Sequence, residues 1–114
     1  NINCCINPLT AVHRVRNGEL LSKTHKDQIT KVIGEVSSVL DDLGYPTLSI
    51  NLWQQVHSVI TDTAKNRSSM LNDVLEGRHT EAEAIVGWLL RQTKRELPAL
   101  NTLATQLRAL EPNH

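Results

Sequence analysis

The chain contains 114 residues, with 12 lysines and arginines against 12 aspartates and glutamates, so its formal charge is zero. A neutral chain has no overall field that would attract nucleic acid or an anionic membrane, so we expect neither as a partner. Its length suits one domain with one hydrophobic core. Hydrophobic residues make up 39% of it, yet there is no Phe, one Tyr and two Trp, which predicts an aliphatic core of packed helices.

Signals for export and membrane insertion are missing from the sequence. It contains no signal peptide and no apolar run of about 18 residues. Its two cysteines, Cys4 and Cys5, are neighbours and cannot form a disulfide framework. These features predict a cytoplasmic protein.

The first segment, from Asn1 to about Arg14, has apolar residues at helical spacing on both sides of Pro8. We expect a helix that kinks at Pro8, although Asn7-Pro8 could instead be an N-cap followed by the first helical residue. Asn17-Gly18 then predicts a turn.

The next helix is expected between Asp27 and Gly44, where the apolar residues share one helical face over several turns. Gly44 followed by Pro46 is typical of a helix C-terminus. A further helix begins near Thr47 or Ser49, either of which could cap it, and fades around residues 65–66.

Capping residues, a glycine and prolines mark the ends of the remaining predicted helices. A short helix opens at Ser68 and closes at Gly77. Thr80 and Glu83 form a capping box, followed by Ile85, Trp88 and Leu89 at helical spacing. Pro98 precedes a last helix that Pro112 ends. Because no alternating strand pattern or internal repeat is present, the predicted fold is all-α with about six helices.

Motifs for phosphate and metal binding are also missing. The five glycines form neither a GxGxxG turn nor a GxxxxGK[ST] loop, and the five histidines and Cys4-Cys5 lack metal-ligand spacing. We expect no metal site, and we interpret the histidines as surface or half-buried residues and the cysteines as packing residues.

Three polar features could carry function, and each also has a structural interpretation. Asn3 and Asn7 project from one helical face within an apolar stretch, where amides need partners; alternatively, Asn7 is only a cap. The pair Ser68-Ser69 would lie at a helix N-terminus, which suits an anion or simple N-capping. Glu81 would lie in the first turn of its helix, where a carboxylate is stabilised in any case.

These features occur within four strings that stand in a characteristic order, Asn3-Cys4-Cys5-Ile6-Asn7-Pro8-Leu9-Thr10-Ala11, Asn17-Gly18-Glu19-Leu20, Asn66-Arg67-Ser68-Ser69-Met70-Leu71-Asn72-Asp73 and Arg78-His79-Thr80-Glu81. Together they closely resemble the C-terminal domain of ketopantoate reductase, also named 2-dehydropantoate 2-reductase, over nearly the whole chain. The resemblance implies a helical bundle like the C-terminal domain of 6-phosphogluconate dehydrogenase. It also implies an N-terminal Rossmann domain that binds NADP, with the active site in the cleft between the two domains.

The resemblance also implies roles for individual residues. Asn3, Asn7, Asn17 and Ser69 match residues that bind the substrate, a small 2-oxo acid. Glu81 matches a glutamate that approaches the cofactor and the catalytic lysine. That lysine, the general acid, falls before residue 1, so no catalytic residue is expected within this chain. Val86 stands where many relatives have Asn, a difference that we expect to alter helix packing rather than chemistry.

We therefore expect the substrate-binding domain of an NADP-dependent reductase of pantothenate and coenzyme A biosynthesis, inactive by itself. The alternative is a non-catalytic helical module for interaction or dimerisation. A homodimer is compatible with both, because an isolated domain exposes the surface that normally packs on its partner.

Overall fold

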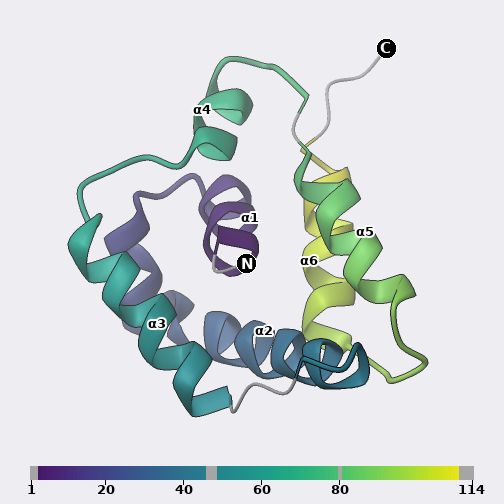
Figure 1. Ribbon diagram of the computed structural model, residues 1–114. Coiled ribbons are helices and arrows are strands. Elements are labelled where there is room, and N and C mark those ends of the chain that lie inside the picture. Colours follow the sequence, from purple (N-terminus) through teal and green to yellow (C-terminus); the bar gives the residue numbers. More distant parts are fainter. Residues whose placement is uncertain (1–2, 46–48, 80, 111–114) are drawn as a thin grey trace.

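Six α-helices and one 3₁₀ helix make up the computed structural model in Figure 1, which describes residues 3–45, 49–79 and 81–110. In chain order these elements are α1 (Asn3–His13), η1 (Asn17–Leu21), α2 (Lys23–Asp42), α3 (Ser49–Asp62), α4 (Ser69–Leu75), α5 (Ala82–Arg91) and α6 (Pro98–Arg108). The described residues contain no strand, so the all-α prediction is confirmed.

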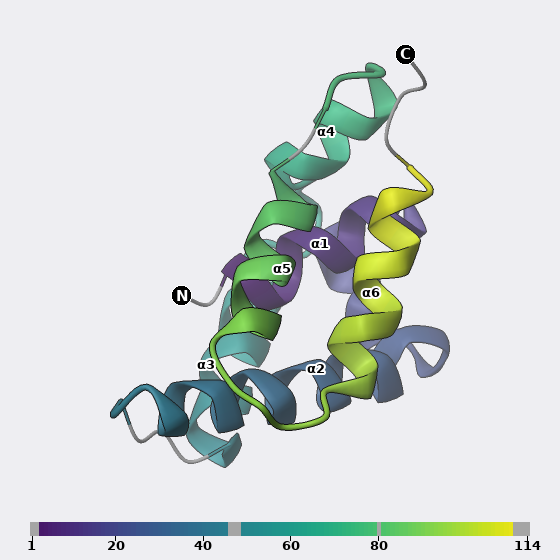
Figure 2. The same cartoon turned by 90° about the vertical axis from the view of Figure 1, so that its right-hand side faces the viewer.

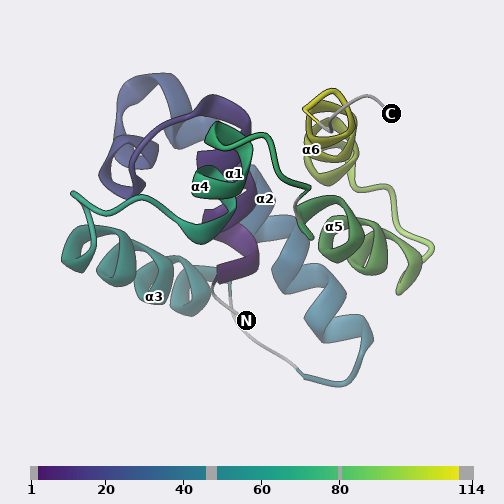
Figure 3. The same cartoon turned by 90° about the horizontal axis from the view of Figure 1, so that it is seen from above.

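Helix α1 occupies the centre of the fold. It contacts every other element, and in Figure 1 it is seen nearly end-on, with α2, α3, α4, α5 and α6 around it. Figure 2 shows α2 crossing below α1 and α4 above it, while α5 and α6 lie to one side of α1 in Figure 3. Pro8 lies inside α1, so the alternative in which the helix begins at Asn7 is wrong.

The buried core is aliphatic and gathers residues from η1 and from every α-helix except α4, whose half-buried Met70 packs against it. Its members include Ile6, Leu9, Leu20, Ile29, Val32, Ile33, Val36, Val56, Ile60, Val86, Leu89, Leu100, Leu103 and Leu107. Cys5 is fully buried among them, as expected for a packing residue. Trp88 was predicted at helical spacing with the buried Leu89, yet 49% of the surface of Trp88 is exposed.

Three of the predicted helix ends are confirmed with their geometry. Gly44 has φ +87°, and the N–H of Tyr45 donates to the carbonyl of Leu40 at 2.8 Å, which closes the end of α2. Ser68 precedes α4 and accepts a hydrogen bond from the N–H of Leu71 at 3.0 Å, and Gly77 with φ +73° follows that helix. Pro46, Thr47 and Pro112 lie outside the described residues.

Three local predictions need correction. Helix α2 begins at Lys23, four residues before the predicted start at Asp27. Its first turn is polar, so apolar periodicity did not indicate it. The predicted turn at Asn17-Gly18 is the start of 3₁₀ helix η1. Thr80 is outside the described residues, but α5 begins at Ala82, and Glu83 accepts a hydrogen bond from Arg108 Nε at 2.8 Å, so Glu83 serves an ion pair between α5 and α6.

Helix α6 begins at Pro98, as predicted, and its cap comes from another helix. Its own N-cap residue makes no side-chain capping bond. Instead, the two carboxylate oxygens of Glu35 in α2 accept hydrogen bonds from the N–H groups of Ala99 and Leu100, each at 2.7 Å. A carboxylate on the first free N–H groups of a helix is stabilising, so Glu35 fixes where α6 meets α2.

Candidate site at the junction of α1 and α4

A chain of hydrogen bonds connects α1 to the start of α4. Thr10 Oγ1 donates to the carbonyl of Asn7 at 2.9 Å and lies 2.6 Å from Ser68 Oγ. Both hydroxyl residues are buried, and Ser69 follows directly as the first residue of α4. These bonds therefore connect α1, which carries the predicted site residue Asn7, to the start of α4, where the predicted site residue Ser69 lies.

The other α1 position is set by the helix itself. Asn3 and Asn7 are four residues apart in α1, so the two positions are about one helical turn apart. Asn7 is half-buried, whereas Ser69 is exposed. The side chain of Asn3 is outside the described part of the structure.

Asn17 is buried and has an unusual amide. Its Nδ2 donates to Thr63 Oγ1 at 2.9 Å, and the hydroxyl of Thr63 in turn donates to the carbonyl of Val59 at 2.6 Å. Because the one hydroxyl proton of Thr63 is used, its oxygen must accept from the amide, which fixes the orientation of Asn17. Asn17 Oδ1 is the one buried side-chain N or O atom among the described residues that has no hydrogen-bond partner. Such an atom is uncommon in a folded protein.

Backbone hydrogen bonds from Asn17 and Gly18 hold the segment that leads into α4. The Asn17 N–H donates to the carbonyl of Asn66 at 3.1 Å, and the Gly18 N–H donates to that of Ala64 at 3.0 Å. A Cβ atom on Gly18 would lie 2.7 Å from the Cβ of Ala64, so only glycine permits this approach. Asn17 and Gly18 thus fix the position of the segment that precedes Ser68 and Ser69.

Glu81 lies immediately before α5, away from these contacts. It is exposed, its side chain makes no capping bond, and it borders a hollow of about 330 Å³ with Ala84, Ile85 and Trp88. The cofactor role of Glu81 stays a prediction. The described residues alone do not join Glu81 to Asn7 and Ser69.

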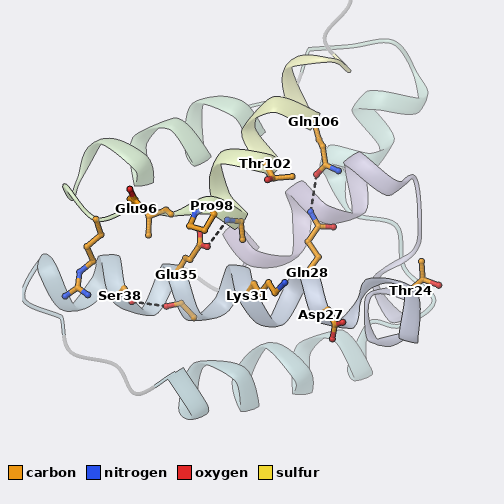
Figure 4. Close-up of a pocket in the computed structure, with 14 residues that line it drawn as sticks. Thr24, Asp27, Gln28, Lys31, Glu35, Ser38, Glu96, Pro98, Thr102 and Gln106 are labelled. Carbon is orange, nitrogen blue, oxygen red and sulfur yellow. Dashed lines mark hydrogen bonds between the residues drawn. The ribbon is translucent and has the colours of Figure 1, made fainter.

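A groove of about 1090 Å³ lies elsewhere, between α2 and α6. Figure 4 shows Glu35 reaching toward the start of α6, and Gln28 donating to Gln106 across the groove, a bond of 3.1 Å. Asn3, Asn7, Asn17, Ser69 and Glu81 are not among the residues that line it. The paired polar groups of this groove serve the contact between α2 and α6.

Two histidines meet near the end of α1. The rings of His13 and His25 lie 4.3 Å apart, and His13 Nε2 is 2.6 Å from Gln28 Oε1. Burial, followed by the neighbouring His13, lowers the pKa of His25, and Glu19 opposes this shift.

Within the described ranges, no three His, Cys, Asp or Glu residues are grouped so that they could hold a metal ion. None of the described helices has the length and apolarity needed to cross a bilayer.

Sequence reasoning missed the partners that build this site. Thr10 and Ser68 are 58 residues apart, and Thr63 and Ala64 lie in a polar stretch without a recognisable pattern. Ser68 was expected as a cap, but no local signal indicated that its hydroxyl also reaches α1.

Comparison with known proteins agrees with this architecture. Residues 1–111 match the family model described as "Ketopantoate reductase PanE/ApbA C terminal". The chain is 45% identical over 93 residues to a 2-dehydropantoate 2-reductase of Salmonella typhi, covering 82% of this chain and 30% of that protein. It is 40% identical over 115 residues to the corresponding protein of Bacillus subtilis, covering 98% and 38%.

A solved structure gives the same answer. The chain superimposes on the crystal structure of the probable 2-dehydropantoate 2-reductase panE from Bacillus subtilis with a TM-score of 0.86 and 38% identity, covering 96% of this chain and 38% of that one. Fold and motifs together define an all-helical C-terminal domain. The chain belongs to the ketopantoate reductase C-terminal family, and it spans about a third of the length of these relatives.

Proposed function

We propose that this chain is the substrate-binding domain of an NADP-dependent 2-dehydropantoate 2-reductase, which reduces ketopantoate to pantoate in pantothenate and coenzyme A biosynthesis. The chain then requires an N-terminal Rossmann domain to form the cleft. The observation that supports this proposal is the junction of α1 and α4, where the Thr10–Ser68 contact connects the helix that carries Asn7 to the helix that Ser69 begins. Family membership supports the choice of reaction.

The residues of this chain act by binding and orienting the 2-oxo acid. Asn3, Asn7 and Ser69 offer amide and hydroxyl groups that can hold its carboxylate and hydroxyl oxygens. The unpartnered Oδ1 of Asn17 is an acceptor, so it suits a hydroxyl or ammonium donor rather than a carboxylate. When bound, NADPH supplies the hydride, and protein groups only position and polarise.

Glu81 has a different task in this proposal. Its exposed carboxylate can accept hydrogen bonds from cofactor hydroxyls, and a carboxylate beside the upstream lysine favours the charged ammonium that donates the proton. Because that lysine lies outside this chain, the domain holds the substrate but cannot complete proton transfer.

The test is to measure NADPH oxidation with ketopantoate by this chain alone and by the same chain joined to its N-terminal domain. We expect turnover only from the joined protein. Turnover by the chain alone would contradict the assignment of the general acid to the missing part. A joined protein that binds NADPH but leaves ketopantoate unreduced would contradict the proposed substrate.

A further inference from the structure

We propose that Thr10 and Ser68 are positioning residues, whose buried hydroxyl pair sets the place of Ser69 relative to Asn7 and thereby the affinity for the 2-oxo acid. This inference rests on the proposed function. It concerns two residues that do not touch the substrate themselves and that connect the two elements carrying the residues that do.

The three hydrogen bonds at this pair can form together in only one arrangement of protons. Thr10 has a single hydroxyl proton, and it donates that proton to the carbonyl of Asn7 at 2.9 Å. At the 2.6 Å contact with Ser68, Thr10 Oγ1 must therefore accept, and Ser68 must donate. Ser68 Oγ still accepts from the N–H of Leu71 at 3.0 Å. Each hydroxyl thus donates once and accepts once, in one direction from α4 to α1.

Burial makes this arrangement rigid. Thr10 is fully buried and Ser68 is 6% exposed, so water cannot replace either hydroxyl without entering the core. Removing the Thr10 hydroxyl leaves the buried Ser68 hydroxyl without its acceptor. Removing the Ser68 hydroxyl leaves the N–H of Leu71 without its acceptor, and either loss is costly. The pair therefore has one favourable geometry, and the spacing between α1 and the start of α4 follows from it.

Both ends of this chain of bonds belong to the site. One end is the carbonyl of Asn7, whose side chain is assigned to the substrate, and the other end is Ser68, whose neighbour Ser69 opens α4. A displacement of about 1 Å between groups that hold one small ligand can reduce the catalytic rate by about a hundredfold. A shift of α4 against α1 would separate these groups without removing either.

The experiment uses the complete enzyme, with this chain joined to its N-terminal domain. Thr10→Val keeps the shape of the side chain and removes the hydroxyl, Thr10→Ser restores the hydroxyl, and Ser68→Ala removes the other partner. Thr30→Val is the matched control, because Thr30 is an exposed helical threonine whose hydroxyl donates to the carbonyl of Lys26 at 2.8 Å. The KM for ketopantoate and the KM for NADPH are measured separately for each variant.

We expect Thr10→Val and Ser68→Ala each to raise the KM for ketopantoate about tenfold or more, with the KM for NADPH within about twofold of wild type. Thr10→Ser and Thr30→Val should stay within about twofold in both. The effect of the double variant on the KM for ketopantoate should be smaller than the two single effects combined, because both single variants remove the contact between Thr10 and Ser68.

Three results would overturn the role of this pair while wild-type turnover stands. They are an unchanged KM for ketopantoate, an equal rise in both KM values, and additive effects in the double variant. If Thr10→Val fails to fold, Ser68→Ala at the edge of α4 and the Thr10→Ser rescue decide the matter. A wild-type enzyme that binds NADPH and leaves ketopantoate unreduced would instead refute the proposed function, and this role with it.

Discussion

Replacing Gly18 with alanine should destabilise the domain, because Gly18 lies against the segment that leads to Ser68. The new Cβ would be 2.7 Å from the Cβ and 3.0 Å from the carbonyl oxygen of Ala64. Carbon atoms in favourable contact are about 3.5–4.0 Å apart, so one backbone must move by about 1 Å. The obstacle is backbone and a short side chain, neither of which can rotate away.

The size of the effect follows from three contributions. Overpacking costs about 1–3 kcal/mol, and weakening the 3.0 Å bond from the Gly18 N–H to Ala64 adds about 0.5–1.5 kcal/mol. The stiffer unfolded chain returns about 0.4–1 kcal/mol. We expect the free energy of unfolding to fall by about 1–3 kcal/mol, measured by urea denaturation followed by circular dichroism.

Gly34 provides the matched control. It lies in the interior of α2, and a Cβ atom there would meet nothing within 4 Å. Gly34→Ala should therefore raise the free energy of unfolding by about 0.5–1 kcal/mol. If Gly18→Ala proved as stable as Gly34→Ala, the close approach of η1 to Ala64 would be refuted.

Three further outcomes follow from other contacts. Glu35→Ala should lower the free energy of unfolding by about 1–2 kcal/mol, with Glu35→Gln between it and wild type, because the amide keeps one of two capping acceptors; equal stability of all three in urea denaturation would contradict this cap. The pKa of His25 is lowered from 6.5 in the folded chain, so as the pH falls the unfolded chain binds a proton at His25 before the folded chain does. The stabilisation from neutral His25 is therefore present above pH 6.5 and is lost as the pH falls through the folded pKa. His25→Gln should flatten that part of the stability profile, and an unchanged profile would contradict the assignment. Trp88 borders the same hollow as Glu81 and is 49% exposed, so joining the N-terminal domain should reduce acrylamide quenching of its fluorescence. A Trp88→Phe variant, which retains Trp53, should show a smaller reduction. Equal quenching before and after joining would place the contact between the domains elsewhere.

The helix pattern could be predicted from the sequence wherever a local rule sets an end. Gly44, Ser68 and Pro98 each mark a boundary through their own backbone or side-chain chemistry, and the structure has all three. The start of α2 was misplaced because its first turn carries no apolar residue. Exposure of Trp88 was not predictable, because periodicity identifies an apolar face but not which part of it another element covers.

The members of the candidate site rest on the resemblance and stay predictions, and the contacts that position them could not be predicted from the sequence. The motif strings indicated Asn7 and Ser69 through resemblance, yet the contact between α1 and α4 depends on Thr10 and Ser68, which are 58 residues apart. Asn17 matched a substrate-binding residue, whereas the structure buries it with its Nδ2 on Thr63. Long-range hydrogen bonds of this kind are set by packing, and no local pattern encodes them.

The most direct measurement of the central claim is the kcat/KM for ketopantoate of the complete enzyme carrying Asn7→Ala or Ser69→Ala. Each change removes one polar group from the junction of α1 and α4, and an exposed serine elsewhere, Ser58 in α3, provides the control Ser58→Ala. We predict that kcat/KM falls at least about tenfold for both site variants and is unchanged for the control. Wild-type values for Asn7→Ala and Ser69→Ala would contradict the claim that this junction binds the substrate.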